Sequence, residues 1–108
     1  MEVELDIFSG RPNPKWTLGK DSAARLIAIE QGLTPAGAVP KTPPPLGYRG
    51  FRYVIDDRAR SAYLGQIQYG DNRLDDPNCT IERMLLASLP AEFANLTVRI
   101  ASLLAAIR

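Results

Sequence analysis

The placement of proline constrains this chain more than any other sequence feature. Nine of its 108 residues are proline, and most of them fall in two clusters. Pro12 and Pro14 lie on either side of Asn13, and the stretch 34–47 reads TPAGAVPKTPPPLG. Because proline fixes φ and has no amide hydrogen, neither cluster can continue through a helix or a central strand. We therefore expect a kinked corner at 9–14 and a long Pro-rich loop at 34–47, in part with polyproline II geometry.

Hydrophobic periodicity predicts strands and one helix in the first two thirds of the chain. Residues 2–8 alternate between apolar and mostly acidic side chains, which is typical of a strand with one buried face. An apolar stripe predicts a helix over 20–31. Two further strands are predicted over 48–55 and 62–69, joined as a hairpin by the polar residues 56–61.

The last third of the chain has helical periodicity. Asp76 and Pro77 are typical of an N-cap followed by the first helical position, and this helix is expected to end near Ser88. A second helix is expected over 91–107. The order of the elements predicts a single α+β domain over 1–108, in which about three helices cover one face of a small antiparallel sheet of about three strands.

Composition excludes several kinds of chemistry. The chain has no histidine and one cysteine, which excludes an imidazole base, an internal disulfide and a cysteine-rich zinc site. Its formal net charge of +1 gives no overall attraction to nucleic acid or anionic lipid. The start of the chain lacks the pattern of a signal peptide, and no apolar run reaches the roughly 20 residues of a membrane-spanning helix. We expect a cytoplasmic protein without metal, cofactor, nucleic acid or membrane partner.

The first candidate site is the segment SGRPNPKW, in which two prolines hold the backbone. Rigidly presented side chains of Arg11, Asn13 and Trp16 suit the recognition of an anion or a planar ligand through hydrogen bonds and stacking. The alternative is a kinked corner in which Trp16 covers the core and Arg11 pairs with a nearby carboxylate.

The second candidate site is the segment LGYRGFR, which contributes Tyr48, Arg49 and Arg52 as candidate ligand-binding residues. Arg49 and Arg52 are an odd number of positions apart, so they cannot share one face of a regular strand. One of them should then lie toward the buried face or on a bulge, where it needs a carboxylate partner such as Asp6 or an acid of the hairpin turn. The alternative is a solvated strand end with a tight glycine contact.

Acidic pairs and the single cysteine have structural explanations. The pair Asp56 and Asp57 suits a hairpin turn, the pair Asp75 and Asp76 suits a helix cap, and neither has the spacing of a calcium loop. Cys79 is placed in the first turn of a predicted helix, where the helix dipole lowers a thiol pKa. Because the chain offers no histidine to act as its base, we expect a packed, free thiol.

The C-terminal helix is apolar around most of its circumference. Between Met84 and Ile107 the only charged residues are Glu92 and Arg99. A helix that is apolar nearly all round should be buried nearly all round, and one small sheet could not cover it. We therefore expect a homo-oligomer or a protein partner on this helix, and the candidate interface residues are Phe93, Leu96, Ile100, Leu103, Leu104 and Ile107.

The motifs SGRPNPxW and LGYRGF together resemble segments of small uncharacterised bacterial proteins. The resemblance covers roughly residues 2–53, and it implies no activity and no catalytic or binding residue. It directs attention to the two arginine-containing segments.

Two functional hypotheses follow from the sequence. The first is a non-enzymatic binding or interaction protein, which associates through its C-terminal helix and recognises a small anionic ligand with the two arginine-containing loops. The alternative is a small cofactorless isomerase, cyclase or hydrolase. It would use Asp6 or Asp56 as base, a tyrosine as proton donor, and Arg11 or Arg49 to stabilise an oxyanion. It requires a carboxylate and an arginine to converge in one concave pocket.

Overall fold

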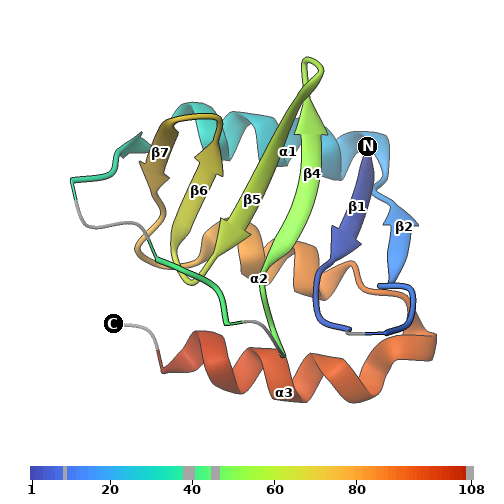
Figure 1. Ribbon diagram of the computed structural model, residues 1–108. Coiled ribbons are helices and arrows are strands. Elements are labelled where there is room, and N and C mark those ends of the chain that lie inside the picture. The colour runs from blue at the N-terminus through green and yellow to red at the C-terminus, as the bar shows by residue number, and fades with distance from the viewer. Residues whose placement is uncertain (9, 38–40, 45–46, 107–108) are drawn as a thin grey trace.

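The computed structural model describes residues 1–8, 10–37, 41–44 and 47–106, and in this part of the chain it has one antiparallel sheet of seven strands. The strand order is β2-β1-β4-β5-β6-β7-β3 (Figure 1). The strands are β1 (Glu2–Leu5), β2 (Lys15–Thr17), β3 (Thr34–Pro35), β4 (Phe51–Ile55), β5 (Arg58–Tyr63), β6 (Gln66–Tyr69) and β7 (Asn72–Asp75). The α+β class agrees with the sequence, but the prediction of a sheet of about three strands was wrong.

Two tight turns shape the middle of the sheet and account for one of the additional strands. Asp56 and Asp57 have φ angles of 51° and 63°, and Leu64 and Gly65 have φ angles of 44° and 87°. Two successive residues with positive φ form the type of two-residue turn that matches the twist of a hairpin. The link predicted between the two hairpin strands is therefore only two residues long, and the second predicted strand is split in two at Leu64.

The helices are α1 (Lys20–Gln31), α2 (Thr80–Ala87), the short 3-10 helix η1 (Ala91–Phe93) and α3 (Ala94–Ala105). The first agrees with the predicted range, whereas α2 begins later than predicted because Cys79, at φ 52°, leaves helical geometry. Asp76 still accepts a hydrogen bond from Ile81 N at 3.0 Å. None of the described helices is long and apolar enough to cross a membrane.

The helix-covered face of the sheet forms the core. Leu5, Phe51, Ala62 and Ile67 are neighbours across β1, β4, β5 and β6, and all four are buried. Figure 1 shows α1 and α2 behind the strands and α3 along the lower edge of the sheet. The side chains that these helices bury in the same core include Leu26, Ile81, Leu85, Leu96, Ile100 and Leu104.

The opposite face, which we call the open face, carries polar side chains. Glu4, Arg52, Ser61 and Gln68 are neighbours across the same strands, shifted by one residue from the apolar row. No helix of the described chain lies in front of β4 and β5 on this face (Figure 1). One face of the sheet is therefore available for contacts outside the chain.

Part of the predicted Pro-rich loop at 34–47 is more ordered than expected. Its first residues form β3, which pairs with β7 at one edge of the sheet. Residues 41–44 are exposed and have no regular structure, and Lys41 N donates to Gln66 Oε1 at 3.0 Å. Residues 38–40 and 45–46 of the loop lie outside the described residues.

Candidate functional site

The two arginine-containing segments meet at Asp6, which lies just after β1 and is buried. Asp6 N donates to Gly50 O at 2.9 Å, and Arg49 N donates to Asp6 O at 2.8 Å. These bonds extend the pairing of β1 with β4 beyond the strand ends and place residue 49 beside residue 6. The prediction that Asp6 supplies a partner for an arginine is confirmed.

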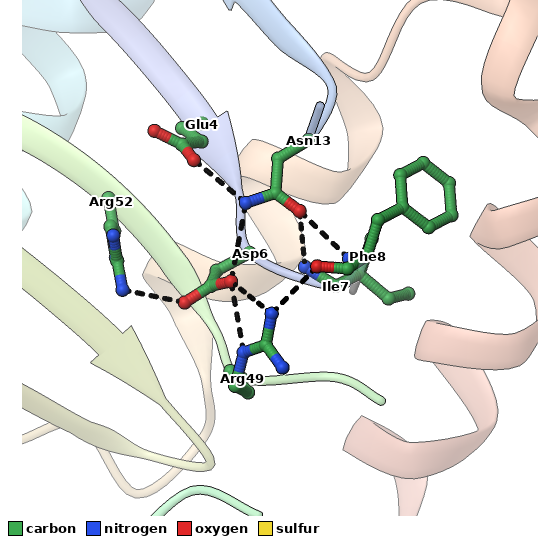
Figure 2. Close-up of polar contacts among 7 residues, drawn as sticks. All are labelled: Glu4, Asp6, Ile7, Phe8, Asn13, Arg49 and Arg52. Carbon is green, nitrogen blue, oxygen red and sulfur yellow. Dashed lines mark hydrogen bonds and ion pairs between the residues drawn. The ribbon is translucent and has the colours of Figure 1, made fainter. Parts of the chain in front are cut away.

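The Asp6 carboxylate binds both arginines (Figure 2). Arg49 donates to Oδ1 through Nε at 3.0 Å and through Nη2 at 2.8 Å, while Arg52 Nη2 donates to Oδ2 at 2.7 Å. The two can share one carboxylate because Arg49 precedes β4 and is separated from it by Gly50, whose φ is 102°. Their exposure differs: the Arg49 side chain is 20% exposed and the Arg52 side chain is 59% exposed.

Asn13 is the residue that closes the Pro-kinked corner. Its Oδ1 accepts hydrogen bonds from Ile7 N at 3.1 Å and from Phe8 N at 2.8 Å. Its Nδ2 donates to Glu4 Oε2 at 2.8 Å and to Asp6 Oδ1 at 3.3 Å (Figure 2). These four bonds use both donors and both acceptor positions of the amide. Asn13 therefore orders the corner, and a ligand would have to displace one of these bonds to reach it.

Arg11 and Trp16, the other two candidate residues of the first segment, contact residues other than Asp6. The Arg11 guanidinium lies over the Phe8 ring at 3.8 Å, a cation–π contact in place of the predicted carboxylate pair. Trp16 Nε1 donates to Ser88 Oγ at 2.9 Å, and the indole meets Phe51 edge to face at 6.3 Å between ring centres. Trp16 thus covers the core, as the alternative interpretation of this segment expected.

Tyr48 of the second candidate segment is buried away from Asp6. Its hydroxyl donates to Glu82 Oε1 at 2.6 Å, and Glu82 also accepts from Leu64 N at 2.7 Å and Gly65 N at 2.9 Å. Burial, followed by the charge of Glu82, raises the pKa of Tyr48. Of the six candidate ligand-binding residues, the structure gathers Asn13, Arg49 and Arg52 at Asp6.

Next to this cluster the open face has a hollow of about 640 Å³, which we call the open-face groove. Strands β1, β2, β4, β5 and β6 form it, with the turn residue Gly70. Its lining includes Glu2, Glu4, Lys15, Arg52, Val54, Ala59, Ser61 and Gln68. Sequence reasoning selected only Arg52 from this set. The alternation along β1 and β4 was the available signal, because every second residue of these strands faces away from the core.

The strand register arranges the groove into a polar row and an apolar pair. Glu4 lies directly between Lys15 and Arg52, and Ser61 and Gln68 continue this polar row across β5 and β6. Beside the row, Val54 pairs with Ala59 across β4 and β5. Val54 is 51% exposed, which is unusual for a valine in a central strand. The groove can therefore offer charge, hydrogen bonds and an apolar contact to one ligand.

Two further buried carboxylates were not singled out from the sequence. Glu82 ties α2 to the turn between β5 and β6 through the contacts described above. Glu30 of α1 pairs with Arg60 Nε at 3.2 Å and accepts a hydrogen bond from the Tyr53 hydroxyl at 3.1 Å. Burial, followed by the charge of Glu30, raises the pKa of Tyr53. Both carboxylates have structural partners that link a helix to the sheet.

The Cys79 side chain is packed in the core, and the pKa of its thiol is raised, whereas a helix N-terminus would lower it. It is fully buried and lies before the first residue of α2, outside the helical turn predicted for it. Burial, followed by the nearby charge of Glu82, raises the pKa of the thiol to about 12.

The carboxylate, tyrosine and arginine of the enzymatic alternative do not converge. Asp6 is bound to Arg49 and Arg52, whereas the hydroxyls of Tyr48 and Tyr53 are bound to two other carboxylates that belong to α2 and α1. Asp56, the second base considered, is an exposed turn residue. Asp6 and Arg49 of this alternative therefore meet, but neither lines a groove with the hydroxyls of Tyr48 and Tyr53, which are bound to Glu82 and Glu30.

Half of the candidate interface residues are buried within the chain itself. Leu96, Ile100 and Leu104 are at most 2% exposed, because α3 packs against α2 and these side chains belong to the same core cluster. Phe93 is partly buried, Leu103 is 47% exposed, and Ile107 lies outside the described residues.

Comparison with known proteins adds no assignment. No protein-family model matches the chain, and neither a curated protein nor a solved structure matches it. Among the described residues, no group of three acidic or cysteine side chains is arranged to hold a metal ion.

Proposed function

We propose that the protein is a non-enzymatic binding protein whose open-face groove recognises a small ligand with an anionic group. Arg52 is the residue that contacts this group. The observation that carries the proposal is the environment of Arg52: its side chain is 59% exposed and lines a hollow of about 640 Å³, while a buried carboxylate holds one of its nitrogens.

Asp6 orients Arg52 for binding. It does not cancel the charge of Arg52, because the same carboxylate is shared with Arg49. Arg49 already occupies Asp6 Oδ1 with two donors, so Asp6 and Arg49 form a paired unit. Arg52 reaches the remaining oxygen through Nη2, and the bond fixes the guanidinium at the edge of the groove. A planar, oriented guanidinium matches the two oxygens of a carboxylate. Because Asp6 already holds the side chain, less conformational entropy is lost when the ligand binds.

Titration of the ¹⁵N-labelled protein with sodium acetate, followed by NMR, tests this proposal. We expect amide shifts in β1, β4 and β5, with affinity about tenfold lower for Arg52→Gln. Arg99→Gln is the matched control, because Arg99 is an exposed arginine on α3. Equal binding by Arg52→Gln and Arg99→Gln, or shifts scattered over the whole surface, would overturn the proposal.

Self-association through α3 is a second, separate proposal, with a second copy of this chain as the partner. It is favoured by Val98 and Leu103, which are large hydrophobic residues on α3 with 72% and 47% exposure. Exposed Ala94 and Ala101 lie near Val98 at helical spacing and would allow another helix to approach closely.

A further inference from the structure

The geometry points to a zwitterionic ligand for the open-face groove: an α-amino acid with an aliphatic side chain. This inference rests on the proposed anion site at Arg52 and names the class of ligand that the rest of the groove would accept.

The charges of the groove favour a ligand that carries both signs. The charged residues in its lining are Glu2, Glu4, Lys15, Arg52 and the largely buried Arg60, whose charge is paired with Glu30 outside the groove. The remaining two acids and two bases balance. A simple anion that reached Arg52 would therefore also meet two carboxylates. A zwitterion has no net charge and can match a positive and a negative group at once.

Opposite charges are placed next to each other where the anion would bind. Glu4 is directly opposite Arg52 across β1 and β4, and residues in this position have Cβ atoms about 4.5–5.5 Å apart. The ammonium and carboxylate of an α-amino acid are attached to one carbon, so neighbouring partners of opposite sign suit them. Asn13 Nδ2 donates to Glu4 Oε2, and this hydrogen bond holds the carboxylate in place. Arg52 would bind the ligand carboxylate and Glu4 its ammonium.

The apolar pair lies within reach of the same ligand. Val54 is two residues from Arg52 on the same face of β4, a distance of roughly 7 Å along the strand. Val54 and its partner Ala59 are both exposed and both line the groove. A side chain of the size of leucine, attached to the carbon that bears the two charged groups, would cover this pair and remove apolar surface from water.

L-Leucine and two of its derivatives separate the parts of this inference. The ¹⁵N-labelled protein is titrated with L-leucine, with N-acetyl-L-leucine, which lacks the ammonium, and with L-leucinamide, which lacks the carboxylate. We expect leucine to bind about tenfold more tightly than either derivative. Glu4→Gln retains an acceptor for Asn13 but removes the charge, so it should abolish the preference for leucine over N-acetyl-leucine. Glu92→Gln, at an exposed residue of η1, is the matched control.

The outcomes distinguish this inference from the proposed function. If N-acetyl-leucine binds as tightly as leucine and binding still depends on Arg52, the anion site stands and the zwitterion is overturned. An unchanged preference in Glu4→Gln overturns it as well. If none of the three compounds shifts the groove amides, the ligand class is wrong, and the acetate titration decides separately whether the anion site exists.

Discussion

At the scale of single residues, the buried carboxylates show how the chain accommodates charged groups in its interior. Asp6 is paired with two arginines, Glu30 with Arg60, and Glu82 accepts from two backbone amides and a tyrosine hydroxyl. A buried carboxylate is tolerated only when such partners replace its hydration. Each of these groups therefore fixes a particular junction of the fold, and the Asp6 junction also orients Arg52.

Asn13→Asp tests the corner that supports this junction. The substitution keeps an acceptor for the amides of Ile7 and Phe8, but it places a third carboxylate against Glu4 and Asp6. We expect the free energy of unfolding in urea to fall by about 2–3 kcal/mol. Asn95→Asp, at an exposed position of α3, should change it by less than about 0.5 kcal/mol. Equal losses in the two variants would contradict the role given to Asn13.

Ionisation of the Cys79 thiol makes the free energy of unfolding depend on pH, and the raised pKa gives the direction of this dependence. The pKa of its thiol rises from the ordinary 9.0 to about 12 on folding, so above pH 9 the unfolded chain releases a proton that the folded chain retains. The stabilising contribution is complete below pH 9 and is lost as the pH rises toward 12. Urea unfolding at increasing alkaline pH should therefore show a shallower loss of stability for Cys79→Ala than for the wild type. Parallel curves would contradict the burial of this thiol.

At the scale of elements, two-residue turns determine which strands become neighbours. The turns at 56–57 and 64–65 use positive φ at both positions, and they bring β4, β5 and β6 into one continuous meander. Glu82 accepts from both amides of the second turn, so α2 is anchored where β5 passes into β6. The floor of the open-face groove depends on these turns, because they set the register of Arg52 with Ser61 and of Ser61 with Gln68.

Gly50→Ala tests the junction where β4 begins. Gly50 has a φ of 102°, and an added Cβ would lie 2.3 Å from Ala62 O on the neighbouring strand. Gly47 also has positive φ, 88°, but an added Cβ there meets no atom of the described chain within 4 Å. We expect Gly47→Ala to lose about 1–2 kcal/mol of unfolding free energy and Gly50→Ala about 3 kcal/mol or more. Similar losses would show that β4 and β5 do not pack as closely as described.

At the scale of the whole molecule, a single sheet separates a core built with three helices from an open face with a mixed polar and apolar groove. Leu96, Ile100 and Leu104 of α3 are buried in the core cluster of the chain itself, which leaves less of this helix for another chain to cover. The groove is the stronger candidate for outside contact, because it combines an oriented guanidinium with acidic, hydroxyl and aliphatic side chains.

The sequence predicted those helices and strands that depend on the pattern of neighbouring residues. The helix over 20–31 and the strands at 2–8 and 48–55 were placed correctly to within a few residues. A parity argument named Asp6 and the acids of the hairpin turn as candidate arginine partners, and Asp6 is the one that binds. The turn at Leu64 was missed because an apolar residue with positive φ gives no turn signal. The groove was missed because it exists only once several strands are in register, and no single segment contains it.

The α3 surface gives a prediction about size in solution. If a second copy packs on α3, Leu103→Asp and Val98→Asp should each reduce the mass measured by light scattering to that of one 11.9 kDa chain while the fold is retained. Thr80→Asp, at an exposed position that begins α2, is a control for added charge. A wild-type protein that is already monomeric, or variants of unchanged mass, would contradict self-association through this surface.

The central claim is that a ligand occupies the open-face groove. Isotope-filtered NOE spectra of ¹³C,¹⁵N-labelled protein with bound unlabelled L-leucine test it most directly, because they report which protein methyl groups lie beside the ligand. We expect NOEs from the leucine methyls to Val54 and Ala59, and their loss in Arg52→Gln. NOEs to Val98 and Leu103 of α3 instead, or groove NOEs that persist in Arg52→Gln, would contradict it.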